Sequence, residues 1–404
     1  ELTALIGQQE QRVRARPRDA GAWAVLGAAY VERGRRTADA ANYPKAERAL
    51  RTSLEVRGER NAEALEGLAA LALARRDFQE AKEYGEQALQ LTPKRWSAYP
   101  PLIDAYTGLG DYKAVGSTLD KLLKLHTDAG DRPAVMAKVS AVYRDRGWRE
   151  DAAAQLTDAA AAARTPAQQA AYLAGVGQLA WERGDLQDAL RHYDAALRLD
   201  PDQREAPAGR GRVLAALGRT AEAVAAYRAG LARQPSPRDA FELGELYASL
   251  GKSRQAHDQF DRMRDLALRE ADDGVDVELL IGRYEADHGD PLEAVDRLRD
   301  EWERQPGIEV ADALGWALHR AGQEEEALDY ASTATDGEKG GGVLSALYAF
   351  HRGMIEVELG MDGAARRHLQ RALRINPHFS PLWAPEAKDM LRTLGDAPDE
   401  PPPS

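Results

Sequence analysis

Cysteine is absent from all 404 residues of this sequence, which excludes disulfides, thiolate metal sites and a cysteine nucleophile. Aromatic residues are sparse, at 6%. No apolar run approaches the length of about 20 residues that a membrane-spanning helix needs. The 66 acidic and 54 basic residues give a net charge of −12. This balance argues against a nucleic-acid backbone as the main partner, because such binding depends on clustered lysine and arginine.

The hydrophobic fraction of 44%, with 30% charged residues, is ordinary for a folded chain and excludes wholesale disorder. The length allows two or three compact domains or one extended array. An internal repeat favours the array, because five residues return after a shift of 34 positions. Gly184, Ala189, Tyr193, Ala196 and Pro201 recur as Gly218, Ala223, Tyr227, Gly230 and Pro235.

This order of glycine, alanine, aromatic residue, alanine and proline resembles the tetratricopeptide repeat (TPR), a helix–turn–helix unit. The family pattern also places its apolar and small residues on one face of the first helix, at the spacing i, i+3, i+4 and i+7. Laid along the chain, the pattern predicts about ten units. One such helix pair cannot bury its apolar face alone, so neighbouring units must stack. The resemblance therefore implies an all-α, right-handed superhelical solenoid of antiparallel helix pairs.

The same alignment divides the chain into four parts. Residues 1–19 and 379–395 read as N-terminal and C-terminal capping helices around an array over 20–378. The proline-rich tail over 396–404 predicts disorder. Two adjacent prolines, Pro100 and Pro101, fall inside the predicted first helix of the third unit. They predict that this helix starts late or is kinked.

Patterns that could carry chemistry are better explained by the repeat. The segment Gly251–Ser253 ends like a P-loop, but the first P-loop glycine is missing and the template assigns Gly251 to the turn between two helices. The acidic run over 272–278 does not match an EF-hand, and no nucleophile-elbow motif occurs. Four histidines recur at nearly even spacing, but they fall at different template positions and so predict no metal ladder. These are His257, His288, His319 and His351. The sequence therefore predicts no enzyme activity, no catalytic residues, no metal and no cofactor.

The resemblance implies a function as well as a fold. First helices of TPR solenoids line a concave groove, so we expect a non-enzymatic scaffold that binds a peptide or protein partner. The alternative is an accessory or sensing protein that binds a small ligand or metal for an exported or membrane-associated system. A chaperone C-terminal tail is not the expected partner, because the lysine and asparagine pattern of the family's chaperone-binding clamp is missing. The opening residues 2–30 resemble TPR domains of cytochrome c assembly proteins and exported or membrane-anchored actinobacterial TPR proteins. We therefore expect an extracytoplasmic or anchored location, through a segment upstream of Glu1, rather than a cytoplasmic one.

Positions 5, 9 and 12 of each unit lie on the face beside the packing face, and the resemblance to the family assigns that face to the groove. In units five to nine these positions hold large or charged side chains suited to an interface. The predicted partner-binding residues are Gln178, Trp181, Arg212, Glu245, Arg283, Trp316 and His319. We expect the two tryptophans to anchor the partner, although they could instead fill gaps between adjacent repeats.

Charge is unevenly distributed along the chain. The segment 270–340 holds 21 acidic and 6 basic residues. It forms either solvated outer helix faces or an acidic surface that attracts a basic partner or a cationic ligand.

Overall fold

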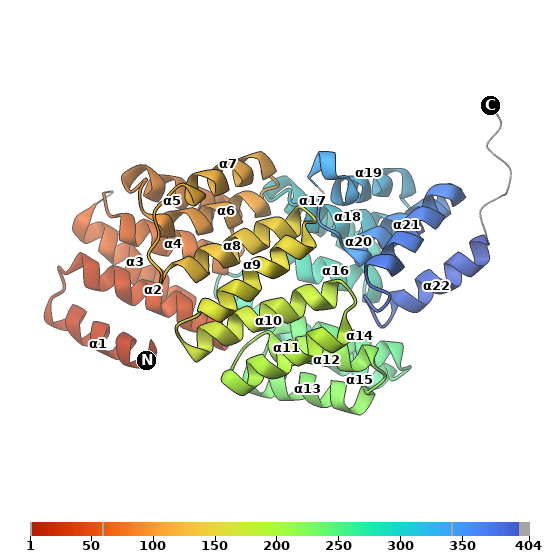
Figure 1. The fold of residues 1–404 in the computed structure, drawn as a ribbon, viewed down its shortest axis with the longest axis horizontal. Coiled ribbons are helices and arrows are strands. Elements are labelled where there is room, and N and C mark those ends of the chain that lie inside the picture. Colours follow the sequence, from red (N-terminus) through yellow and green to blue (C-terminus); the bar gives the residue numbers. More distant parts are fainter. Residues whose placement is uncertain (1, 59, 341, 396–404) are drawn as a thin grey trace.

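We describe the chain from a computed structural model that covers residues 2–58, 60–340 and 342–395. Within these ranges the chain consists of 22 α-helices joined by turns and three short 3-10 helices (Figure 1). The all-α solenoid predicted from the sequence is confirmed. Every helix in these ranges is too short or too polar to cross a membrane. The tail over 396–404, for which the sequence predicts disorder, lies outside the described residues.

Twenty of the helices form ten antiparallel pairs, and one further helix covers each end of the array. The end helices are α1 (Leu2–Ala15) and α22 (Trp383–Leu394). The pairs are α2 (Ala20–Thr37) with α3 (Tyr43–Arg57), α4 (Ala62–Ala74) with α5 (Phe78–Leu91), α6 (Tyr99–Gly108) with α7 (Tyr112–Leu123), α8 (Arg132–Asp145) with α9 (Arg149–Ala162), α10 (Pro166–Glu182) with α11 (Leu186–Leu199), α12 (Ala206–Ala216) with α13 (Thr220–Arg233), α14 (Pro237–Ser249) with α15 (Ser253–Asp272), α16 (Glu278–His288) with α17 (Pro291–Arg304), α18 (Ile308–Arg320) with α19 (Glu324–Thr335), and α20 (Ala346–Glu358) with α21 (Asp362–Ile375).

The turn inside a repeat follows from two residue types. Gly184 ends α10 at φ +77°, in the left-handed region that favours glycine. Asp185 then caps α11, and its carboxylate accepts a hydrogen bond from the Asp188 amide at 3.2 Å. Gly251 makes the same kind of turn between α14 and α15 at φ +68°, which supports its assignment as a turn residue.

Small residues set the distance between neighbouring helices. Ala189 and Ala196 are fully buried where α11 crosses α10. A Cβ atom added to Gly209 would lie 2.3 Å from Cζ of the buried Tyr193. The first helix of the sixth repeat can therefore approach the fifth repeat only because it presents a bare backbone there.

The predicted kink at Pro100 and Pro101 is wrong. Helix α6 begins at Tyr99, so both prolines lie in its first turn, where backbone amides have no partner within the helix. The alternative expectation was that the helix starts late. It agrees with the structure, since the short 3-10 helix η2 (Trp96–Ala98) comes first and the α-helix begins only at Tyr99.

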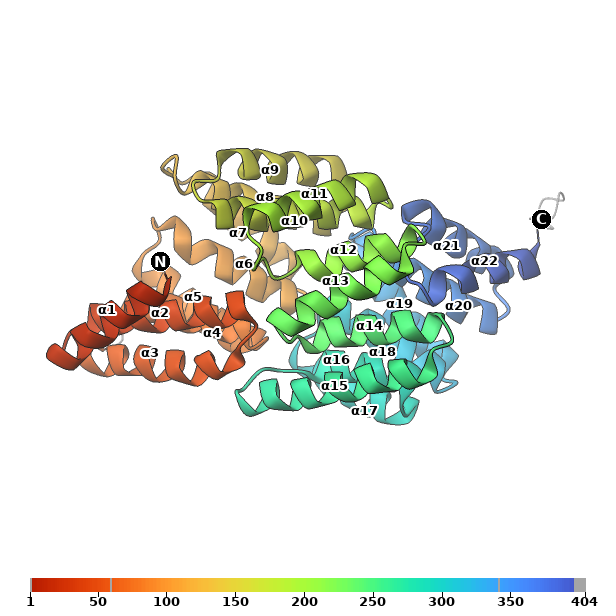
Figure 2. The ribbon, with the colours of Figure 1, turned by 90° about the horizontal axis from the view of Figure 1, so that it is seen from below.

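The array curls until early repeats touch late ones, as Figures 1 and 2 show. The Asp276 amide, just before α16, donates to the Arg75 carbonyl at the end of α4 at 2.7 Å. The Phe78 amide, at the start of α5, donates to Oε1 of Gln305 at 2.7 Å. The superhelix therefore joins its second repeat to its eighth.

Two further bonds continue the same seam. The Ile308 amide donates to the Tyr112 hydroxyl at 3.2 Å, and Nδ2 of Asn376 donates to the Trp181 carbonyl at 2.8 Å. The backbone also approaches closely here, since a Cβ on Gly307 would lie 2.8 Å from the Gly108 carbonyl oxygen. Together these contacts hold the two turns of the superhelix against each other beside its concave face.

Candidate functional site

A cavity of about 720 Å³ lies inside the closed superhelix, and we call it the lumen. Its walls are the first helices of the fourth to tenth repeats, α8 to α20, with Arg76 from the second repeat. The segment from Asn376 to Lys388, which includes the start of α22, closes one side. The lumen thus lies on the face of the first helices that the family resemblance assigns to the groove.

Six of the seven predicted partner-binding residues line this one cavity: Gln178, Trp181, Arg212, Glu245, Arg283 and Trp316. They come from five successive first helices, so positions 9 and 12 do share a wall. His319 does not line the lumen; its Nδ1 lies 2.8 Å from Oε2 of Glu324 at the next turn. As a partner-binding set, these residues stay a prediction.

The two tryptophans are packed between repeats, with Trp181 7% and Trp316 5% exposed. The Trp316 ring stacks on His351 at 4.2 Å between ring centres, and its Nε1 donates to Asp287 at 2.9 Å. The Arg212 guanidinium lies 5.9 Å from the Trp181 ring centre. Both indoles are therefore packed between repeats and also line the lumen, beside the polar side chains of the wall.

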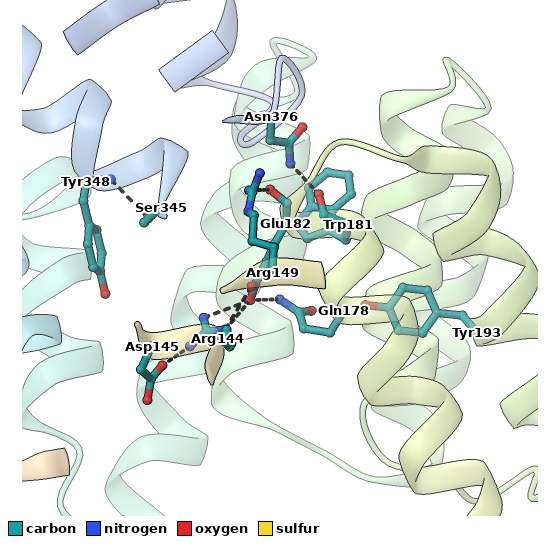
Figure 3. Close-up of polar contacts among 10 residues, drawn as sticks. All are labelled: Arg144, Asp145, Arg149, Gln178, Trp181, Glu182, Tyr193, Ser345, Tyr348 and Asn376. Atoms are coloured by element: carbon teal, nitrogen blue, oxygen red, sulfur yellow. Dashed lines mark hydrogen bonds and ion pairs between the residues drawn. The ribbon is translucent and has the colours of Figure 1, made fainter. Parts of the chain in front are cut away.

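One polar network joins the fourth and fifth repeats at the lumen wall (Figure 3). Arg144 makes a bidentate contact with Glu182, with Nε to Oε2 at 2.9 Å and Nη2 to Oε1 at 2.9 Å. Gln178 donates to the same carboxylate at 3.0 Å, and its own oxygen accepts from the Tyr193 hydroxyl at 3.1 Å. Burial alone would raise the pKa of Glu182, but the Arg144 charge holds it below its ordinary value. Glu182 therefore stays ionised, and this ion pair is satisfied within the protein.

A second network joins the sixth and seventh repeats. Arg212 and Arg238 both approach Glu242 at 3.3 Å, and the Tyr227 hydroxyl donates to it at 3.1 Å. Burial raises the pKa of Glu242, and the two arginines more than offset this, so its pKa lies below the ordinary value. Two cations share the Glu242 carboxylate here, and a second carboxylate, Asp239, acts on the same arginines.

The far wall is formed by the eighth to tenth repeats. Asp312 is 2% exposed, its Oδ1 lies 2.9 Å from Nδ1 of His351, and its Oδ2 has no partner among the described residues. Glu245 lies 3.6 Å from His288, and burial raises the pKa of Glu245. Glu309 is 56% exposed and lies 3.5 Å from Arg76. Within the described ranges, no three histidine, aspartate or glutamate side chains converge to hold a metal.

The sequence prediction missed most of the charged wall because it used too few template positions. Arg238 and Glu309 stand at position 2 of their units, and Glu182 and Asp287 at position 13. These positions lie one helical turn before position 5 and one after position 9, on the same face. Extending the helical periodicity by one turn in each direction would have found them.

Comparisons with known proteins concern the repeat fold. Residues 34–95 and 177–239 match the tetratricopeptide repeat family model. No curated protein matches the sequence. The human IFIT1 dimer with m7Gppp-AAAA superposes with a TM-score of 0.51 at 17% identity, covering 77% of this chain and 70% of that chain.

Two bacterial structures are similar to parts of the chain. A tetratricopeptide repeat protein from Parabacteroides merdae has a TM-score of 0.38 at 18% identity, covering 66% of this chain and 99% of its own. PilF from Pseudomonas aeruginosa has a TM-score of 0.39 at 18% identity, covering 52% and 91%. The ten helix pairs make the chain a helical solenoid, and the two matched stretches, residues 34–95 and 177–239, are similar to tetratricopeptide repeats.

Proposed function

We propose that this protein is a non-enzymatic scaffold that binds a segment of a partner protein or peptide in the lumen. The observation that carries the proposal is the cavity of about 720 Å³, walled by seven successive first helices. Binding sites for ligands typically measure about 300–1,000 Å³ and combine apolar walls with a few placed polar groups. A short extended segment fits that volume and could contact several repeats at once.

The chemistry of the wall supports binding rather than catalysis. Three serines line the lumen, and each hydroxyl caps a helix: Ser236 accepts from the Asp239 amide, Ser345 from the Tyr348 amide and Ser380 from the Trp383 amide. An oxygen that holds a helix N-terminus is not poised as a nucleophile beside a base. Several charged side chains of the wall form ion pairs with each other, such as Arg144 with Glu182 and Arg212 with Glu242.

A small ligand is the second candidate, and the closure of the superhelix favours it. The seam from Arg75 to Asn376 narrows access along the side of the solenoid, which favours a small occupant. In this form the protein would be an accessory or sensing component. It would serve an exported or membrane-associated system, as the resemblance to exported or membrane-anchored proteins suggests.

The test is to fill the lumen. Ala216 lines the cavity at the end of α12, and Ala216→Trp would occupy part of it. Ala229→Trp, on the exposed face of α13, is the matched control. Peptides selected from a displayed library against the parent should lose binding to Ala216→Trp and keep it for Ala229→Trp, with unchanged circular dichroism in both. Equal binding to both variants would place the site outside the lumen.

A further inference from the structure

The charges of the lumen wall do not select an occupant by sign. Eight carboxylates line the cavity against six arginines and one lysine, so the two signs nearly balance. The second to eighth repeats and their connecting loops supply all six arginines and six of the carboxylates. The rest of the wall, from the ninth repeat to Lys388, carries few charges but six aromatic or imidazole rings. We therefore looked for selectivity among those rings.

Five of the rings around this part of the wall form one packed group, which we call the aromatic cluster. The Trp316 ring stacks on His351, with 4.2 Å between ring centres and 16° between planes. Trp383 meets the Trp316 ring edge-on at 5.7 Å. Phe350 contacts both Trp383 and Phe379, with ring centres 5.9 and 5.5 Å away. All members except Phe350 line the lumen, and Trp383 and Phe379 are only half-buried, so the cluster offers ring surface to the cavity.

His351 gives the cluster a polar edge at the lumen. The residue is 5% exposed, and its Nδ1 lies 2.9 Å from Oδ1 of the buried Asp312. An ionised carboxylate can only accept, so Nδ1 carries the proton of this bond, and Nε2 of the neutral imidazole keeps a free lone pair. Within the described ranges Nε2 has no hydrogen-bond partner, yet it is not among the buried unpaired atoms. Since His351 lines the lumen, Nε2 is an open acceptor at the cavity wall.

The direction of this acceptor is fixed by its surroundings. Asp312 holds Nδ1 and Trp316 covers one face of the imidazole, so the ring cannot turn without losing both contacts. Trp316 is held in turn, because its Nε1 donates to Asp287 at 2.9 Å. A site with a fixed polar group among apolar rings discriminates strongly against an occupant that lacks the matching group, because the polar group is then left unpaired.

We propose that the aromatic cluster binds a tyrosine or tryptophan side chain of the partner segment, whose O–H or N–H donates to Nε2 of His351. This inference rests on the proposed function, and it names the side chain that the segment presents. The partner's ring packs against Trp383 and Phe379, at the 4.5–7 Å between ring centres that is usual for aromatic pairs. Asp312 does not touch the ligand; it is a positioning residue that keeps the lone pair of His351 directed at the lumen.

The test compares labelled peptides on the full chain by fluorescence anisotropy. All are one Gly/Ser peptide with two variable positions, filled with tyrosine, tryptophan, phenylalanine, glutamate or lysine. The cysteine-free chain allows a single environment-sensitive dye on Ala216→Cys, which reports whether a peptide enters the lumen. We expect the tyrosine and tryptophan peptides to bind and to shift the dye. The phenylalanine peptide, which lacks only the hydroxyl donor, should bind about tenfold more weakly, a factor that corresponds to about 1.4 kcal/mol.

Variants and NMR then identify the acceptor. His351→Phe keeps a ring on Trp316 but removes Nε2, so the tyrosine and phenylalanine peptides should bind it equally. Asp312→Asn should also reduce the preference for tyrosine, because an amide can donate to Nδ1 and so allow the tautomer with its proton on Nε2. His319→Phe is the control, since His319 pairs with Glu324 outside the lumen. In the unaltered protein, the ¹⁵N signal of His351 Nε2 should move with the tyrosine peptide and stay with the phenylalanine peptide.

The outcomes separate this inference from the proposed function. If peptides enter the lumen but tyrosine and phenylalanine bind equally, or the Nε2 signal of His351 does not move, only the assignment of the side chain is overturned. The same conclusion follows if the glutamate or lysine peptide binds best, or if neither the tyrosine nor the tryptophan peptide binds. The absence of any dye shift, together with equal binding of library-selected peptides by Ala216→Trp and Ala229→Trp, would overturn the proposed function as well.

Discussion

Replacing Gln305 should open the seam between the two turns of the superhelix. Its side chain is 2% exposed; Oε1 accepts from the Phe78 amide at 2.7 Å, and Nε2 donates to Oε1 of the buried Glu301 at 2.8 Å. The Phe78 amide lies in the first turn of α5 and has no partner within that helix. Gln305→Ala therefore leaves the amide without its acceptor, at a cost of about 1–3 kcal/mol.

The assay is hydrogen exchange at that amide. Because 1.4 kcal/mol corresponds to a factor of about ten, exchange at Phe78 should become about fivefold to a hundredfold faster. The Asp276 amide, which donates to Arg75 across the same seam, should also exchange faster. Gln79→Ala is the control, since exposed Gln79 bonds only to Glu83 on its own helix among the described residues.

Gln305→Glu separates the two bonds. It keeps an acceptor for Phe78 but places a second carboxylate against Glu301, whose pKa burial already raises. A group whose folded pKa is raised stabilises the fold below its unfolded pKa and loses that contribution as pH rises through the folded pKa. The variant should therefore be closer to the parent near pH 4 than at pH 7. Unchanged exchange at Phe78 in Gln305→Ala would refute the seam at this position.

Three further predictions concern packing and charge. Ala189→Leu should lower the free energy of unfolding by about 1–3 kcal/mol through overpacking, measured by urea denaturation, because Ala189 is fully buried where two helices cross. Trp316→Ala should lower the melting temperature clearly, at a cost of about 3–5 kcal/mol for a buried aromatic, whereas a purely partner-facing residue would leave it unchanged. Burial raises the pKa of Asp239 to about 7, so the stability of the parent should fall between about pH 4 and 7, and Asp239→Asn should remove that part of the pH dependence in thermal melts.

The helix pairs were predictable because their signals are local and repeated. The spacing of Gly184, Ala189 and Tyr193 fixes a turn, a helix crossing and a core residue within one repeat, and the next repeat shows the same pattern. Positions 9 and 12 likewise placed six residues on the lumen wall, since helical periodicity determines which side chains share a face.

The closure of the superhelix was not predictable in this way. Phe78 and Gln305 are far apart in sequence, and neither belongs to the repeat pattern. They meet only because the small curvature of each repeat accumulates along the array. The burial of Trp181 and Trp316 is a second example. A large aromatic residue at position 9 or 12 suits a groove and a gap between repeats equally, and only the packing of the next repeat decides between them.

Gly307→Ser tests the closed superhelix most directly. Gly307 precedes α18 with φ −81° and ψ 162°, a conformation that serine adopts without strain, and serine is a favoured N-cap residue. In an open solenoid this change should stabilise the protein by up to about 1 kcal/mol. In the closed superhelix the new Cβ meets the Gly108 carbonyl oxygen at 2.8 Å, so the turns must separate. We predict a lower melting temperature and faster exchange of the Phe78 and Ile308 amides; a higher melting temperature with unchanged exchange at both amides would contradict the closed lumen.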